Sequence, residues 1–189
     1  MNLNRSGYSP IAVVQSVPSA DMAIRYGAAS VTIRDPKGTI TMDNATSGIG
    51  DGAPIRHVLD CITDSDSAAF CFGAFTRTGG RYSCLERFRE TWRTRRLVKV
   101  KEVMGYEVLG QAVNIGGPSS AYTRNASDAS FAIGMQWAAE MQLLLDHRLV
   151  KAHPVQEIPG GLGGVLEGLG VLRAGGIRGR KLAVQICQR

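Results

Sequence analysis

Short apolar runs and helix-like segments alternate along the first half of this chain, and this alternation limits its fold more than any other feature. Runs typical of strands lie at 9–16, 29–34, 55–63 and 81–86, with one more within 95–110. Segments with helical spacing and capping residues lie between them, at 19–27, where Ser19 can cap, and at 64–80. The sequence therefore predicts an α/β protein with right-handed crossovers and helices on both faces of a parallel sheet.

The rest of the chain divides into predicted loops, a long helix and an extended segment. Residues 127–150 carry the longest helical signal, with apolar side chains near a 3.6-residue period. Small and polar residues fill 35–54 and 114–127, so both are predicted loops. Residues 152–158 are expected to be extended, because a residue that precedes proline avoids the helical region.

The stretch 159–186 could be taken for a nucleotide-binding turn, because nine of its 28 residues are glycine. Such a turn requires the pattern G-x-G-x-x-G between a strand and a helix. The pattern that starts at Gly161 has Leu166 in place of the third glycine. Val165, Leu166, Leu169 and Leu172 instead share one helix face, so we predict a helix ended by Gly175-Gly176 and then a strand. The glycines are close-packing and helix-ending positions, not a phosphate loop.

Charge and cysteine usage exclude several classes of protein. The formal charge is +6, but the densest basic run, from Arg87 to Lys101, alternates with Glu86, Glu90 and Glu102. A nucleic-acid surface instead needs aromatics interleaved with unopposed positive charge. No segment approaches the roughly 18 apolar residues that span a bilayer, and no basic-then-apolar leader opens the chain. The four cysteines and three histidines are dispersed, so we expect reduced thiols, no bound metal and a cytoplasmic protein.

Six segments spread along nearly the whole chain resemble one known family. In chain order they are GYSPIAVVQS, RYGAASV, VLDCIT, GGRYSCLE, VMGYEVLG and HPVQEIPGGLGGVLEGLGVLRAGGIRGRKLAVQI. Together they resemble the C-terminal half of fungal trans-acting enoyl reductases. These belong to the zinc-independent branch of the medium-chain dehydrogenase/quinone reductase superfamily.

The resemblance implies an activity and a partner. The expected reaction is the NADPH-dependent reduction of the α,β-double bond of an unsaturated acyl thioester in fungal secondary metabolism. The acyl chain would be held by the acyl-carrier domain of a highly reducing polyketide synthase, or of a synthase–peptide synthetase hybrid, whose own enoyl-reductase domain is inactive. A complete enzyme of this kind is expected to be a monomer without a nucleic-acid or membrane partner.

The resemblance also implies that part of the family's fold is absent. In the family, an N-terminal half supplies most of the substrate domain, the first Rossmann strand and its Gly-rich turn. We therefore expect residues 1–150 to form an incomplete Rossmann-like dinucleotide-binding domain. Residues 151–189 should return to the substrate domain as a helix and a strand. Because the absent strand lies in the middle of the sheet, the first two strands of this chain should lack a ladder that joins them to the later ones.

Residues 15–19 follow the first predicted strand, where dinucleotide-binding domains meet the adenosine ribose. The segment offers hydroxyl groups and no carboxylate before Asp21, which favours NADPH over NADH. By resemblance to the family's loop, Ser16, Pro18 and Ser19 are candidate cofactor contacts. The alternative for Ser19 is that it only caps the following helix.

The resemblance implies cofactor contacts at three further places. Tyr26 matches a family tyrosine near the adenosine end of the cofactor. Leu85 and Glu86 match a contact at the carboxyl edge of a strand, and Ile177 and Arg178 match a contact before the last strand. From the residues alone, Tyr26 is otherwise a half-buried core residue, and Arg178 a solvated surface arginine.

One segment resembles the family's substrate-lining stretch. Its candidate substrate contacts are Met104, Gly105, Tyr106, Val108 and Leu109. The alternative is an apolar strand packed in the core or at a domain edge. No Ser-His-Asp arrangement, metal cluster or carboxylate pair can be read from the spacing, so no catalytic residue or proton donor is assigned.

Two other functions stay open from the sequence. One is a generic quinone or alkenal reductase of the same superfamily, because a fold resemblance does not separate such chemistries. The other is a non-catalytic remnant that acts as a binding partner for a synthase or another chain. The absence of a Gly-rich turn favours this second alternative.

Overall fold

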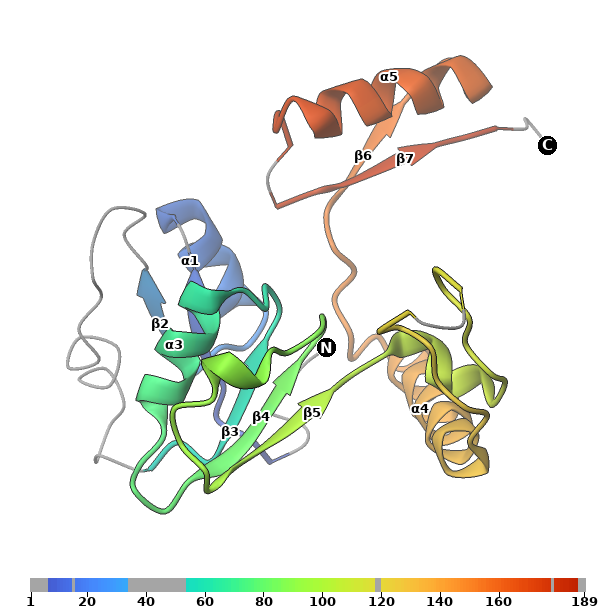
Figure 1. Ribbon diagram of the computed structural model, residues 1–189. Coiled ribbons are helices and arrows are strands. Elements are labelled where there is room, and N and C mark those ends of the chain that lie inside the picture. The colour runs from blue at the N-terminus through green and yellow to red at the C-terminus, as the bar shows by residue number, and fades with distance from the viewer. Residues whose placement is uncertain (1–6, 15, 34–53, 118–119, 178, 187–189) are drawn as a thin grey trace. The chain divides into compact units, whose positions relative to one another are not determined.

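The computed structural model describes residues 7–14, 16–33, 54–117, 120–177 and 179–186 (Figure 1). The chain divides into two compact units: unit 1 contains Met1–Pro36 and Arg148–Arg189, and unit 2 contains Lys37–His147. The predicted loop at 35–54 lies almost wholly outside the described residues. The assignment of residues 1–150 and 151–189 to two domains stays a prediction.

Unit 1 opens with the predicted strand, helix and strand: β1 (Ile11–Val14), α1 (Val17–Arg25) and β2 (Ser30–Ile33). The two strands pair in parallel, with Ile11 opposite Ser30. The side chain of Ser16 caps α1 by accepting a hydrogen bond from the backbone N–H of Ser19 at 3.4 Å. The cap expected at Ser19 was therefore misplaced, because Pro18 is tolerated in the first helical turn and does not delay the start of the helix.

The second part of unit 1 confirms that the glycine-rich stretch forms a helix followed by a strand. It consists of β6 (Val155–Ile158), α5 (Gly161–Arg173) and β7 (Lys181–Val184), and its two strands are parallel. The buried residues of α5 are Gly164 and Gly168, and a Cβ on Gly168 would lie 3.1 Å from the side chain of Ile158. The glycine face therefore lets the helix lie close to its strands.

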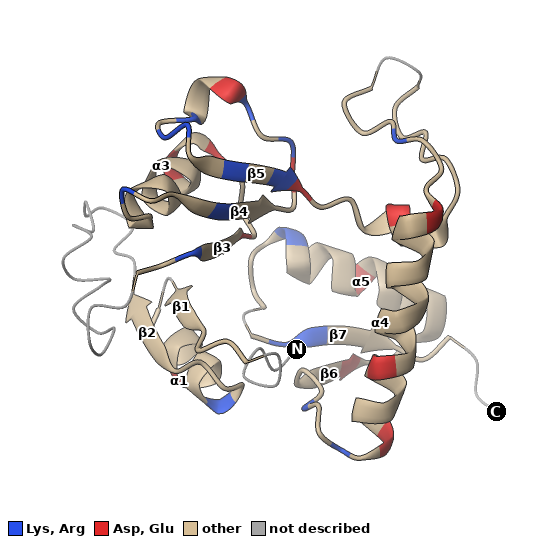
Figure 2. Cartoon of the chain, turned by 90° about the horizontal axis from the view of Figure 1, so that it is seen from below, with Lys and Arg blue, Asp and Glu red and all other residues tan. Residues whose placement is uncertain are grey.

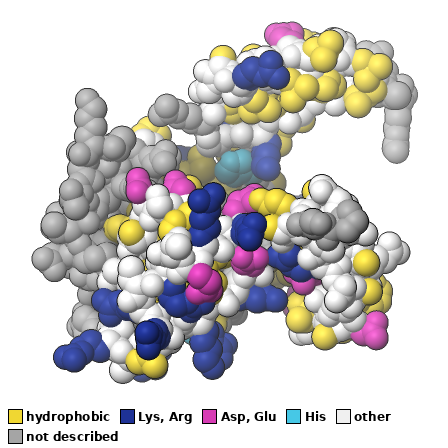
Figure 3. Space-filling view, in the orientation of Figure 1, with side chains coloured by type: hydrophobic (Ala, Val, Ile, Leu, Met, Phe, Trp, Pro, Cys, Tyr) yellow, Lys and Arg dark blue, Asp and Glu magenta, His cyan; other side chains and the backbone are white. Residues whose placement is uncertain are grey.

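The leucine side chains of α5, in contrast, are exposed. Leu166 is 73% exposed and Leu169 is 55% exposed, and hydrophobic side chains are visible along this helix in Figure 3. The predicted helix is confirmed, whereas its leucine face has no cover among the described residues of unit 1.

Unit 2 contains the larger sheet, in the parallel order β3 (His57–Asp60), β4 (Gly80–Cys84) and β5 (Val98–Glu102). Helix α3 (Ser65–Ala74) connects β3 to β4, and a 3-10 turn, η3 (Glu90–Trp92), lies before β5. Asp64 and Ser67 cap the start of α3 reciprocally. The helix is shorter than the predicted 64–80, because Phe75 is extended and only 2% exposed in the core.

Aromatic side chains form the core between α3 and this sheet. The ring centroid of Phe72 lies 5.3 Å from that of Tyr82 and 5.7 Å from that of Phe88. Both Phe72 and Tyr82 are fully buried, and Val98 of β5 is 1% exposed. This packing fixes the strands whose carboxyl ends form the candidate site.

The chain after β5 forms η4 (Gly105–Leu109), a loop bridged by Val113 and Arg124, and α4 (Asp128–Asp146). The predicted long helix is confirmed, with Ser127 as its N-cap. Residues 105–109 are a 3-10 helix, so the alternative of an apolar strand was wrong. Gly134 permits close contact between α4 and Val108, since a Cβ there would lie 2.7 Å from the Val108 backbone oxygen.

The pairing of the strands agrees with the fold predicted from the sequence. All the paired strands are parallel, which confirms the α/β class. Strands β1 and β2 form one ladder and β3, β4 and β5 form another, and no described strand joins the two ladders. Among the described helices, none combines the length and the apolar character that a bilayer crossing requires.

Candidate functional site

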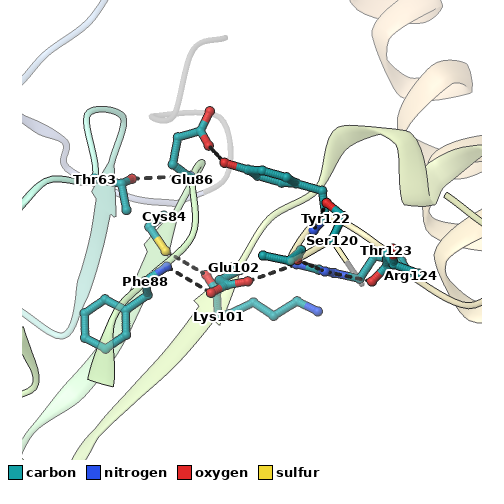
Figure 4. Close-up of polar contacts among 11 residues, drawn as sticks. Thr63, Cys84, Glu86, Phe88, Lys101, Glu102, Ser120, Tyr122, Thr123 and Arg124 are labelled. Atoms are coloured by element: carbon teal, nitrogen blue, oxygen red, sulfur yellow. Dashed lines mark hydrogen bonds and ion pairs between the residues drawn. The ribbon is translucent and has the colours of Figure 1, made fainter. Parts of the chain in front are cut away.

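The carboxyl ends of β3, β4 and β5 meet at one edge of the sheet in unit 2. Open parallel sheets bind their ligands at this edge. Thr63 follows β3, Leu85 and Glu86 follow β4, and Met104 follows β5. Leu85, Glu86 and Met104 line a small pocket with room for about one water molecule. Tyr122 contributes to the same pocket from a different segment (Figure 4).

Asp60, the last residue of β3, forms the hydrogen bonds that connect the segments next to this edge of the sheet. Its side chain is buried, at 4% exposure. One carboxylate oxygen accepts hydrogen bonds from the backbone N–H groups of Ile62 at 2.9 Å and Thr63 at 3.0 Å. The other accepts from the hydroxyls of Ser67 and Tyr82, both at 2.8 Å. Asp60 therefore fixes the turn after β3 to helix α3 and to β4.

Thr63 adopts a backbone conformation that is rare for its residue type. Its φ is 62°, in the left-handed region that a β-branched residue seldom occupies. The backbone N–H of Glu86 donates to the Thr63 hydroxyl at 3.4 Å, which ties the turn after β3 to the turn after β4. Conformations of this kind concentrate at ligand-binding and catalytic positions.

Glu102, at the end of β5, joins two further segments to the edge. One carboxylate oxygen accepts from the backbone N–H of Phe88 at 2.9 Å, and the other forms an ion pair with Arg124 at 2.9 Å. Arg124 also donates to the backbone oxygens of Ala121 and Thr123. Glu102 therefore holds both the segment after β4 and the loop before α4 against the edge.

Tyr122 makes the second contact between that loop and the edge. Its hydroxyl donates to the Glu86 carboxylate at 2.9 Å (Figure 4). This hydrogen bond raises the pKa of Tyr122, because the neutral phenol is the form that donates. The sequence analysis missed Tyr122 and Arg124, since the loop at 114–127 carries no periodic or motif signal.

Two buried groups beneath the edge are protonated at neutral pH. Burial, and then the hydrogen bond to Asp60, raise the pKa of Tyr82. Burial also raises the pKa of the Cys84 thiol to about 11. Neither group is therefore a ready nucleophile or base. In the described ranges, no three His, Cys, Asp or Glu side chains gather in a metal-binding group.

The structure brings together some of the residues that resemblance picked out for this edge. Leu85, Glu86 and Met104 share the pocket. Gly105, Tyr106, Val108 and Leu109 follow Met104 in η4, where Tyr106 is 58% exposed and Leu109 is 62% exposed. Nothing in the sequence pattern alone showed that these side chains are exposed.

The other predicted residues lie in unit 1. Ser16 and Ser19 share a hydrogen bond of 2.9 Å at the start of α1, and Pro18 lies between them. The Tyr26 hydroxyl donates to the backbone oxygen of Ala152 at 2.7 Å. Ile177 is half-buried between α5 and β7. Arg178 lies outside the described residues.

Taken by itself, the site in unit 2 can bind and orient a ligand. It offers backbone groups at two strand ends, a carboxylate, a phenol and exposed apolar side chains.

Comparison with known proteins finds relatives that are named trans-enoyl reductases. It is 45% identical over 186 residues to the trans-enoyl reductase calK of Penicillium decumbens, which covers 98% of this chain and 48% of that protein. It is 44% identical over 187 residues to the trans-enoyl reductase sthE of Phaeosphaeria nodorum, which covers 97% of this chain and 49% of that protein. No protein-family model matches the chain.

A solved structure supports the fold. A probable oxidoreductase from Mycobacterium abscessus matches with a TM-score of 0.60 and 18% identity, over 96% of this chain and 48% of that one. The chain spans about half the length of the curated relatives it matches. In sequence, the chain is therefore similar over nearly its whole length to about half of each of these fungal trans-enoyl reductases.

Proposed function

We propose that the chain is part of a trans-acting enoyl reductase. The enzyme reduces the α,β-double bond of an acyl thioester carried by a fungal polyketide synthase, with NADPH as reductant. The observation that carries this proposal is the 45% and 44% identity to two trans-enoyl reductases over at least 97% of the chain. The pocket at the carboxyl edge of β4 and β5 supports it, because nicotinamide cofactors bind at such edges.

The residues of unit 2 bind and orient in this proposal. NADPH supplies the hydride when it is bound. The turn of Leu85 and Glu86 contacts the cofactor, and its position is fixed by Thr63 and by Tyr122. The apolar side chains from Met104 to Leu109 contact the acyl chain and exclude water from it.

The residues of unit 1 hold the adenosine end of the cofactor. Ser16 and Ser19 place two hydroxyls at the start of α1, and the first turn of this helix holds no acidic residue. A helix start of this kind favours a phosphate group. The hydroxyls of Ser16 and Ser19 therefore bind the 2′-phosphate of NADPH, and Pro18 contacts the cofactor without a hydrogen bond. Tyr26, Ile177 and Arg178 complete the cofactor contacts.

The described cysteines support a cytoplasmic location. Cys61, Cys71 and Cys84 form no disulfide. Free thiols at these three described cysteines suit a reducing compartment. We place the enzyme in the cytoplasm, as a monomer that meets the synthase through its acyl-carrier domain.

The activity is tested on a completed assembly, which is this chain produced together with the part of the P. decumbens relative that it does not cover. NADPH oxidation is followed with crotonyl-pantetheine and, separately, with a small quinone. We expect kcat/KM for the enoyl thioester to exceed that for the quinone at least about tenfold, because the apolar segment 104–109 favours an acyl chain. A higher value for the quinone would assign the chain to the generic quinone reductases instead.

Replacement of Ser16 by aspartate is expected to lower the preference for NADPH over NADH at least about tenfold in the completed assembly. A carboxylate about 4 Å from the 2′-phosphate costs on the order of 1–4 kcal/mol. Aspartate is as good an N-cap as serine, so α1 should keep its start. The measurement is the ratio of the two dissociation constants, followed by tryptophan fluorescence. Ser9→Asp, at an exposed position, is the matched control, and an equal change in both variants would contradict the assignment.

A further inference from the structure

The β3–β4–β5 sheet of unit 2 has two faces of different character. One face packs against α3 and carries the core, including Tyr82 and Val98. Side chains alternate along a strand, so the opposite face carries His57, Leu59, Arg81, Ser83, Lys99 and Lys101. None of these six residues is acidic, and all except Ser83 are exposed. Figure 2 shows the basic segments of β4 and β5 side by side.

The cations of this face lie in register with one another. Arg81 on β4 lies directly opposite Lys99 on β5, and Lys101 follows Lys99 on the same face. Like charges directly opposite each other destabilise a sheet. Within the described part of the chain, neither ion pair involves Arg81, Lys99 or Lys101. An anionic partner would remove this repulsion.

Two physical arguments select the kind of partner. Arginine and lysine are almost never buried without a counter-charge, so apolar packing cannot cover this face. A nucleic acid would be held by aromatic side chains that stack on its bases, and the face carries no Phe, Tyr or Trp. A sheet face with three cations and no anion fits an acidic surface of another folded protein.

We propose that the basic face, defined by Arg81, Lys99 and Lys101, docks an acidic surface of the protein that carries the acyl chain. The inference rests on the proposed function, in which the substrate reaches the site while attached to a separate protein. Electrostatic docking acts mainly on the encounter between the two proteins and falls as salt rises. It therefore affects a carrier-bound substrate and leaves a small free thioester unaffected.

The test uses the double variant Lys99→Glu with Lys101→Glu in the completed assembly. Two substrates are compared: crotonyl-pantetheine and the same acyl group on an isolated acyl-carrier domain of a fungal polyketide synthase. We expect the KM for the carrier-bound substrate to rise at least about tenfold, with kcat/KM for crotonyl-pantetheine changed less than about twofold. Lys181→Glu, at an exposed strand lysine of β7, is the matched control and should leave both values unchanged.

The outcomes separate this inference from the proposed function. Equal KM values for the carrier-bound substrate in the wild type and the double variant would overturn the docking face and leave the activity standing. An equal loss of kcat/KM with crotonyl-pantetheine in the double variant would also overturn the docking face, since the two lysines would then affect the fold of the protein or the chemical step. If crotonyl-pantetheine is not reduced at all, the proposed function fails, and docking is decided by titration of the carrier domain alone. Binding of single-stranded RNA in place of the carrier domain would assign the face to nucleic acid.

Discussion

Residues 1–189 alone are expected to reduce crotonyl-pantetheine at least about 1000-fold more slowly than the completed assembly. Hydride transfer requires that cofactor and alkene be held in a near-attack geometry, and such positioning contributes about 7–11 kcal/mol in favourable cases. The chain spans about half the length of its relatives, so under the proposed function it supplies only part of the cofactor and substrate contacts. A loss of about 4 kcal/mol of this positioning corresponds to the expected factor. The measurement is single-turnover NADPH oxidation by both samples at equal chain concentration.

The same comparison includes a measurement of stability. Leu162, Leu166, Leu169 and Leu172 on α5 are all more than half exposed. Exposed apolar stripes of this kind favour association, so the chain alone should aggregate or unfold at a lower temperature than the completed assembly. Turnover by the chain alone within about tenfold of the completed assembly would refute the prediction. It would show that the described strand ends suffice to orient both reactants.

Replacement of Asp60 by alanine is expected to destabilise unit 2 by about 3–5 kcal/mol. The substitution leaves the Tyr82 hydroxyl and the backbone N–H groups of Ile62 and Thr63 without their acceptor, and the Ser67 hydroxyl keeps only its longer bond to the Asp64 backbone oxygen at 3.3 Å. These groups lie at or near the buried end of β3, where water does not replace the lost hydrogen bonds freely. The measurement is urea unfolding followed by the fluorescence of Trp92, which packs against Phe88 in this unit.

Three further variants make this prediction specific. Asp66→Ala removes an exposed carboxylate from the first turn of α3 and should cost at most about 1 kcal/mol. Tyr82→Phe removes one of the four donors and should cost about 1–2 kcal/mol. Asp60→Asn keeps one acceptor oxygen for the two backbone N–H groups and should fall between Tyr82→Phe and Asp60→Ala. Equal unfolding free energies for Asp60→Ala and Asp66→Ala would falsify the role of Asp60.

The secondary structure of the described chain was largely predictable because its signals are local. Apolar runs bounded by small or polar residues located the strands, and Ser127 marked the start of α4. The errors lie at element ends. Helix α3 ends at Ala74 because Phe75 packs into the aromatic core, and that core is a tertiary contact. The cap of α1 is Ser16 because the path of the chain out of β1 decides which of two serines is extended.

The candidate site was predictable only in part. Leu85, Glu86 and Met104 could be named from a resemblance, and the structure brings them to one pocket. Tyr122 and Arg124 could not be named, because they reach the edge from a loop without any periodic pattern. Their roles depend on contacts with Glu86 and Glu102, which are 36 and 22 residues away in the chain.

The sequence by itself determined the α/β class, the parallel pairing and the family relationship, because each rests on residue order and on local periodicity. Only the tertiary structure decided which polar groups act together. The buried acceptor at Asp60, the left-handed Thr63 and the two contacts that hold the loop before α4 are all products of chain packing. The physical reason is that a strand or a helix is specified by neighbours a few residues apart. A hydrogen-bond network at a sheet edge instead depends on distances between segments that the fold alone brings together.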